Sequence, residues 1–137
     1  RSMNNKELIY KAKKVRENAY APYSNFLVGA ALLTKAGEIY TGCNIENAAY
    51  SPCVCAERTA IFKAVSEQEK EFKAIAIVGG KEGADKTSFC PPCGVCRQVM
   101  REFCQDDFLI ILEGEEGAIK EYTLKELLPE SFKADYL

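Results

Sequence analysis

Residues 26–33 read FLVGAALL, and this stretch decides the fold that the rest of the chain can adopt. The run contains no polar side chain, and turn-forming residues flank it at both ends. An apolar run of this length is typical of a strand that is buried on both faces of its sheet. Such a strand needs helices above and below it, so the stretch predicts a sheet between two helical layers.

The segments downstream of this run supply further strands. A turn around Gly37 leads into residues 38–43, which are predicted to pair with residues 26–33 in the antiparallel sense. Residues 44–54 have no clear period and are interpreted as a loop. Three more strands are predicted, at residues 72–78, 108–112 and 118–122.

Helical periodicity appears in four segments. The first covers residues 4–19, where apolar residues recur at helical spacing: Leu8, Ala12, Val15 and Ala19. Other helices are predicted to begin at Cys55, at Cys93 and after Thr123. In the helix that begins at Cys93, the residues expected to face inward are Val95, Val99 and Phe103. The alternation predicts an α/β fold, a three-layer α/β/α sandwich with a five-stranded mixed sheet.

The composition is that of an ordinary globular domain. The 137 residues fit a single domain over 1–137, with Arg1 and Ser2 ahead of Met3 interpreted as a cloning remnant. No apolar run approaches the roughly 18 residues that a membrane span needs, and no hydrophobic secretion signal opens the chain. With a net charge of −2 and its densest basic stretch at residues 11–16 on a predicted helix face, we expect neither a nucleic acid nor a membrane partner.

The cysteine content points to metal chemistry. The chain has seven cysteines, an odd number, and no histidine. A secreted protein would pair its cysteines in disulfides, so thiols that bind a metal in a cytoplasmic protein are the better interpretation. Without imidazole, a transition-metal site must rely on sulfur.

Two short motifs hold the chemistry. Cys55-Ala56-Glu57 is followed downstream by Pro-Cys-Gly-Val-Cys at residues 92–96, so the motifs together offer three thiolates and one carboxylate. Cys93 and Cys96 lie three apart at the start of a predicted helix, where both sulfurs reach one ion, and a helix start stabilises the Cys55 thiolate. Three such ligands leave a fourth zinc position for water, and Glu57 is placed to move protons.

Charge balance assigns a role to Arg58. Zinc with three thiolates carries a formal charge of −1, which makes a bound water less acidic. Arg58 directly follows Glu57 and can donate a hydrogen bond to a thiolate, so we expect it to provide electrostatic support.

The spacing leaves other sites open. Cys53-Val54-Cys55 could supply two sulfurs to a structural zinc site with four cysteines, together with Cys93 and Cys96. A thioredoxin-like redox pair at Cys93 and Cys96 is less well supported, because no strand directly precedes it. Cys53 and Cys90 stand beside the ligand cysteines and could compete for the metal or become oxidised.

The order CAE followed by PCxxC resembles the established signature of the zinc deaminases, with Cys55 where many members have histidine. Further stretches resemble the short, homotetrameric cytidine deaminases: APYS at 21–24, FLVGAA at 26–31, GCNIENA at 42–48, CAERTA at 55–60 and PCGVCRQ at 92–98. The similarity extends over nearly the whole chain, from the first helix to residues 127–129.

This resemblance implies a role for each matching residue. One zinc ion per subunit is bound by Cys55, Cys93 and Cys96, Glu57 is the proton shuttle, and Arg58 compensates the third thiolate. Asn44 and Glu46 match the residues that bind the ribose 3′-hydroxyl. Phe26 matches a residue that packs against the pyrimidine, and Ala56 one whose backbone N–H binds the base carbonyl. Tyr50 and Phe132 match residues through which a neighbouring subunit of a homotetramer closes each site.

The implied activity is hydrolytic deamination of cytidine and 2′-deoxycytidine to the uridine products with release of ammonia, a step of pyrimidine salvage. One rival is a blasticidin-type deaminase with the same core, against which the Asn44-Ile45-Glu46 match argues. A deoxycytidylate deaminase would need a cationic phosphate pocket, which no motif marks. The rival outside enzymology is a structural zinc module, which predicts four sulfur ligands and indifference to Glu57→Gln.

Overall fold

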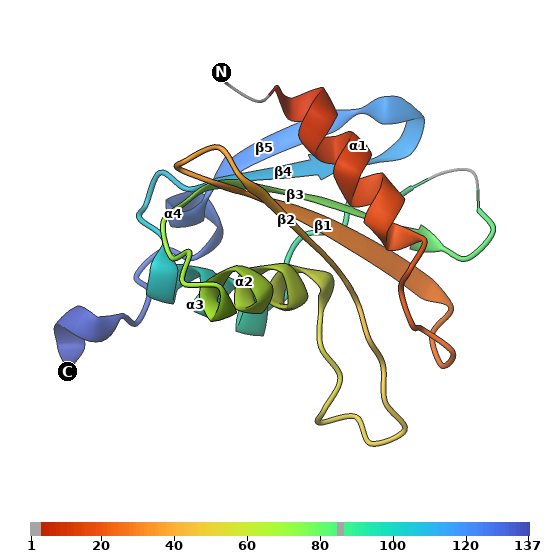
Figure 1. Cartoon of the computed structure of the whole chain (residues 1–137), viewed down its shortest axis with the longest axis horizontal. Coiled ribbons are helices and arrows are strands. Elements are labelled where there is room, and N and C mark those ends of the chain that lie inside the picture. The colour runs from red at the N-terminus through yellow and green to blue at the C-terminus, as the bar shows by residue number, and fades with distance from the viewer. Residues whose placement is uncertain (1–3, 85–86) are drawn as a thin grey trace.

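A five-stranded sheet in the order β2-β1-β3-β4-β5 forms the middle layer of the computed structural model, which describes residues 4–84 and 87–137 (Figure 1). The strands are β1 (Phe26–Thr34), β2 (Ile39–Cys43), β3 (Phe72–Lys81), β4 (Leu109–Glu113) and β5 (Ile119–Thr123). β3 and β4 run parallel, while β1–β2, β1–β3 and β4–β5 are antiparallel. The sheet is therefore mixed, as the sequence predicts.

Helices cover both faces of this sheet (Figure 1). α1 (Asn5–Arg16) lies on one face, and α2 (Ala56–Ser66) and α3 (Gly94–Phe103) lie on the other. The short α4 (Leu124–Leu127) follows β5, and two 3-10 turns, η1 (Glu115–Gly117) and η2 (Ala134–Tyr136), complete the elements. The three-layer sandwich predicted from the sequence is confirmed.

The central strand β1 is buried on both faces, as expected from FLVGAALL. Ala31 and Leu33 pack in the cluster of buried residues that includes Leu8 of α1. Ala30 and Leu32 pack in the opposite cluster, which includes Ile61 of α2. Successive side chains of a strand point to opposite faces, so one apolar run supports both helical layers.

Close contact between strand and helix places the start of α2. A Cβ atom added at Gly42 of β2 would lie 2.5 Å from the Ala60 nitrogen and 2.7 Å from the Ala56 oxygen. The absence of a side chain at this position lets the α2 backbone rest directly on the sheet. This contact fixes the distance between the sheet and the start of α2, which carries the first cysteine motif.

Two helix starts are capped as the sequence indicates. The Asn4 side chain accepts a hydrogen bond from the Glu7 N–H (2.9 Å) at the start of α1. Thr123 and Glu126 form a reciprocal capping box at the start of α4. α1 ends at Arg16, earlier than the predicted residue 19, and the chain continues in a turn.

The inward face of α3 differs from the prediction. Val95 is 57% exposed, whereas Cys96 and Met100 are fully buried and Val99 and Phe103 are half-buried. Because each helical residue turns by about 100°, a face centred on Cys96 and Met100 leaves Val95 outside it. Packing against the sheet determines which face of α3 is buried, and the apolar pattern of the sequence alone did not predict this face correctly.

None of the helices in residues 4–84 and 87–137 combines the length and apolar character that crossing a membrane requires.

Candidate metal centre and active site

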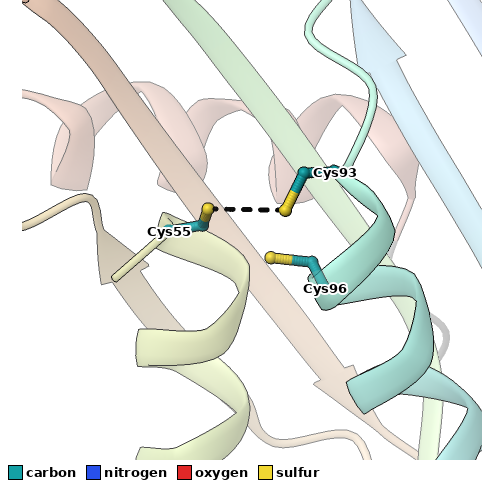
Figure 2. A group of neighbouring side chains, drawn as sticks. All are labelled: Cys55, Cys93 and Cys96. Atoms are coloured by element: carbon teal, nitrogen blue, oxygen red, sulfur yellow. Dashed lines mark hydrogen bonds between the residues drawn. The ribbon is translucent and has the colours of Figure 1, made fainter. Parts of the chain in front are cut away.

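The starts of α2 and α3 lie close together on the same face of the sheet (Figure 1). Cys55 is the N-cap residue of α2 and Cys93 is the N-cap residue of α3, and neither side chain makes a capping hydrogen bond. Cys96 lies in the first turn of α3. All three thiols are therefore free to point into the space between the two helix ends, as Figure 2 shows.

The three sulfurs have the spacing of a zinc site. They all lie within 4.8 Å of one another, and the Cys55 and Cys93 sulfurs are 3.8 Å apart. Two ligands at the usual Zn–S distance of about 2.3 Å in a tetrahedral site would be roughly 3.8 Å apart. Among the described residues, Cys55, Cys93 and Cys96 are the group of side chains whose ligand atoms lie close enough together to hold a metal ion. Three thiols with this spacing fit zinc.

The charge of the thiols is offset locally. The pKa of Cys55 falls to about 5, chiefly because the Cys96 thiol hydrogen-bonds to it, and with help from Arg58. The same hydrogen bond raises the pKa of Cys96. The Arg58 Nη2 lies 3.5 Å from the Cys55 sulfur, and this hydrogen bond raises the pKa of the guanidinium. The arrangement stabilises negative charge on sulfur at two positive helix ends.

Glu57 lies in the first turn of α2 and is only 4% exposed. Burial is the largest cause that raises the pKa of the carboxyl from 4.5 to about 7, and the nearby Cys55 sulfur also contributes to this rise. A carboxyl whose pKa is close to neutrality can both accept and donate a proton at neutral pH. Glu57 therefore has the properties of a general acid–base.

A cavity of about 560 Å³ opens onto these residues. This size suits a small organic molecule. Its lining includes Cys55 and Cys93 of the three-thiol cluster, Glu57, and residues of the loop between β2 and α2. The lining residues that the sequence singled out are Asn44, Glu46, Tyr50, Cys55, Ala56, Glu57, Arg58 and Cys93.

Comparison with known proteins agrees with this geometry. The sequence model of the cytidine and deoxycytidylate deaminase zinc-binding region matches residues 2–112, which contain all three thiols and Glu57. The chain belongs to this deaminase family. It is 51% identical to a cytidine deaminase of Sporosarcina psychrophila, covering 98% of this chain and 96% of that protein. It is 50% identical to a cytidine deaminase of Halalkalibacterium halodurans, covering 97% of each chain.

A solved structure extends the likeness to the fold. The cytidine deaminase from Burkholderia pseudomallei superposes with a TM-score of 0.86 at 45% identity, covering 95% of this chain and 100% of that one. Membership in a family defined by its zinc-binding region identifies zinc as the metal that Cys55, Cys93 and Cys96 fit.

Two residues of the deaminase loop between β2 and α2 are tied to the backbone near β1. The Asn44 amide accepts a hydrogen bond from the Val28 N–H and donates one to the Phe26 carbonyl, both at 2.9 Å. The Glu46 carboxylate accepts hydrogen bonds from the Tyr23 and Ser24 N–H groups. Both side chains line the cavity, and their contact with a sugar stays a prediction.

The three aromatic residues predicted near the substrate differ in position. Tyr50 lines the cavity and is 84% exposed. Phe26 is half-buried and packs against the core beside the cavity, and it is not among the cavity-lining residues. Phe132 is 57% exposed, stacks on Tyr136 with ring centroids 5.9 Å apart, and also does not line this cavity.

The competing set of four cysteine ligands does not form among the described residues. The Cys53 sulfur accepts a hydrogen bond from the Asn47 N–H (3.2 Å) and donates to the Asn47 carbonyl (3.6 Å), and it lies outside the three-thiol cluster. Cys90 lines the cavity with its pKa raised to about 11, chiefly by burial. Both cysteines therefore line the cavity without belonging to the three-thiol cluster.

The sequence interpretation assigned no role to Ser24. This residue lines the cavity and its hydroxyl hydrogen-bonds to Glu46. Ser24 belongs to the APYS stretch that resembles the deaminases, and the signal that could have found it is a hydroxyl residue beside a turn. Nothing in the spacing links residue 24 to residue 46.

Proposed function

We propose that the protein catalyses hydrolytic deamination of cytidine and 2′-deoxycytidine to uridine and 2′-deoxyuridine with release of ammonia, as a step of pyrimidine salvage. The observation that carries the proposal is Glu57, a buried carboxyl with a pKa of about 7 beside the three-thiol cluster, in a cavity of about 560 Å³. The relatives named above, which are cytidine deaminases, support the choice of substrate.

Cys55, Cys93 and Cys96 would hold the zinc ion. A bound zinc ion would lower the pKa of a water molecule and so provide a nucleophile at neutral pH. Glu57 takes the proton from this water and delivers it to the ring nitrogen next to the carbon that bears the amine. Once the oxygen has bonded to this carbon, Glu57 takes the second proton from the added hydroxyl and delivers it to the amine. The C–N bond then breaks, ammonia leaves, and the oxygen remains as the uracil carbonyl.

Backbone and side-chain groups orient the base. Ala56 is the first residue of α2, and the first N–H groups of a helix have no partner within it. Its N–H is therefore available to the carbonyl oxygen of the cytosine ring. Phe26 would pack against the pyrimidine from the core side, and Arg58 keeps the charge of the thiolates balanced.

The sugar end of the cavity favours a nucleoside over a nucleotide. The charged side chains among its described lining residues are Glu46, Glu57 and Arg58, and Arg58 is hydrogen-bonded to Cys55. No free cation of this lining can pair with a 5′-phosphate, and the Glu46 carboxylate would repel one. Asn44 and Glu46 would instead bind the ribose 3′-hydroxyl.

The organisation of the enzyme forms part of the proposal. The exposed rings of Tyr50 and Phe132 support a homotetramer in which a neighbouring subunit completes each site. Residues 1–137 would form one deaminase domain. We propose a cytoplasmic location, because a site built from free thiols requires a reducing compartment.

The test uses the purified protein with zinc content measured in parallel. Loss of cytosine absorbance is followed after addition of cytidine or 2′-deoxycytidine. Glu57→Gln should retain one zinc per chain and lose at least about 10²-fold in kcat, because proton transfer contributes about 10²–10⁴. Glu67→Gln, at the exposed end of α2, is the matched control and should keep full activity. A zinc-loaded protein that converts neither nucleoside would refute the proposal.

A further inference from the structure

The turn at residues 21–25 wraps around the Glu46 carboxylate. Glu46 Oε1 accepts the backbone N–H groups of Tyr23 (2.9 Å) and Ser24 (3.1 Å). Glu46 Oε2 accepts the Ser24 hydroxyl. Two consecutive backbone N–H groups and a hydroxyl thus converge on one carboxylate, and these bonds lower the pKa of Glu46, with the Ser24 hydroxyl as the largest cause.

The proton of the Ser24 hydroxyl has one direction available. The Phe26 N–H donates to the Ser24 oxygen (3.1 Å), so this oxygen already acts as an acceptor. Since Glu46 is ionised and can only accept, the single hydroxyl proton must point to Oε2. Ser24 therefore accepts a hydrogen bond from Phe26, at the start of β1, and donates one to the Glu46 carboxylate.

Counting lone pairs shows what remains for a ligand. An ionised carboxylate has about four acceptor positions, and the turn occupies three of them. Oε1 is saturated by two backbone donors, so the remaining position lies on Oε2, the oxygen held by Ser24. Ser24 and Glu46 both line the cavity, so the carboxylate that carries this position lies beside any molecule bound there.

We propose that Ser24 is a positioning residue for sugar recognition: its hydroxyl orients Glu46 Oε2 so that its free acceptor position meets a hydroxyl of the substrate sugar. This inference rests on the proposed function, in which Glu46 binds the sugar. Ser24 acts through Glu46, and no proton transfer to the base depends on it. Its removal therefore affects substrate binding and leaves the chemical step in place.

The turn is supported from outside the cavity. The Lys81 ammonium donates to the Ser24 carbonyl (3.1 Å), and the Glu82 N–H donates to the Asn25 carbonyl (2.7 Å). The end of β3 therefore holds the turn in place without the serine hydroxyl. Ser24→Ala should fold normally, with Tyr23 and Ser24 N–H groups still bound to Oε1, and lose only the orientation of Oε2.

The experiment compares two substrates that differ only in the sugar hydroxyls. For cytidine, Ser24→Ala should raise KM about tenfold and leave kcat within about twofold, since a charge-assisted hydrogen bond is worth about that factor or more. For 2′,3′-dideoxycytidine, which lacks the hydroxyl that Glu46 would bind, Ser24→Ala should match the parent protein in kcat/KM. Ser24→Thr restores the hydroxyl and should recover most of the cytidine affinity.

Ser66→Ala is the matched control, because the Ser66 hydroxyl also donates one hydrogen bond, here to the Lys63 carbonyl, but at the exposed end of α2. It should change neither substrate. An equal loss on cytidine and on dideoxycytidine would show that Ser24 only supports the fold, and an unchanged KM for cytidine would show that it does not position Glu46. Either result overturns the proposal.

A second readout separates this inference from the proposed function. The carboxyl of Glu46 is titrated by NMR in the parent and in Ser24→Ala, where loss of the hydroxyl should raise its pKa toward 4.5. If the zinc-loaded parent converts no nucleoside, the proposed function fails, and this titration alone decides the positioning role. An unchanged Glu46 pKa then refutes it.

Discussion

Gly42→Ala should damage the proposed metal centre although Gly42 is not one of the proposed zinc ligands. A methyl group at this position would lie 2.5 Å from the Ala60 nitrogen, 2.7 Å from the Ala56 oxygen and 2.9 Å from Thr59 Cβ. Two of these atoms belong to the α2 backbone, so no side-chain rotation relieves the clash. α2 must move away from β2.

The size of the movement follows from these distances. Ordinary contact begins at 3.4 Å, so α2 must shift by about 0.9 Å relative to Gly42. Zinc sites tolerate about 0.2 Å in their ligand distances. Overpacking of this kind costs about 3 kcal/mol in unfolding free energy when backbone must yield, which corresponds to about 10 °C in Tm for a domain of this size. The zinc affinity should fall at least about tenfold, as Cys55 moves with α2.

The assay is urea unfolding of the zinc-loaded protein, with zinc affinity measured by competition against a chromophoric chelator. Gly94→Ala is the matched control. Gly94 lies between two proposed ligands in the first turn of α3, and a Cβ atom there meets nothing within 4 Å. This change should leave the unfolding free energy unaltered or raise it by up to about 1 kcal/mol, because alanine favours the helix.

The reasoning is refuted if Gly42→Ala unfolds within about 0.5 kcal/mol of the parent and binds zinc with the same affinity. It is equally refuted if Gly94→Ala is the more destabilised of the two. Either outcome would mean that the contact between β2 and α2 does not determine how far the start of α2 lies from the sheet.

Three further predictions concern the cysteines. Arg58→Ala should weaken zinc binding about tenfold by removing the donor to Cys55, measured by chelator competition, and an unchanged affinity would contradict the charge argument. Cys53→Ser should retain one zinc per chain and Cys96→Ala should lose it, as measured by atomic absorption. Zinc loss from the Cys53 variant would instead support a zinc site with four cysteine ligands. Burial raises the pKa of Cys104 from 9.0 to about 12, so the folded chain keeps a proton that the unfolded thiol releases. The contribution of Cys104 to the unfolding free energy is therefore complete below pH 9.0 and is lost as the pH rises toward about 12. In urea unfolding at a series of pH values, Cys104→Ala should lack this decrease. An identical pH dependence in the variant and the parent would exclude Cys104 as its source.

Much of the layered fold follows from local pattern. The run at residues 26–33 is buried on both faces because it has no polar side chain to direct to solvent. The capping box at Thr123 follows in the same way from short-range hydrogen bonding. Val95 shows the limit of such patterns, since an apolar residue at a helix start does not reveal which side of the helix meets the sheet.

For the metal centre, the sequence by itself determined which chemical groups are available. Cys93 and Cys96 share one helix start, and Glu57 follows Cys55 within one turn, so their relative placement depends on helix geometry alone. In a chain without histidine, these groups predict sulfur ligands for zinc and a carboxylate as the proton carrier.

Tertiary structure decided which sulfurs meet and what surrounds them. Cys55 and Cys93 are distant in the sequence and come within 3.8 Å because α2 and α3 rest on the same face of the sheet. Cys53 has the spacing of a ligand but hydrogen-bonds to Asn47 instead, and Ser24 reaches Glu46 through a turn held by β3. These choices depend on contacts between segments far apart in the chain, and residue spacing holds no information about such contacts.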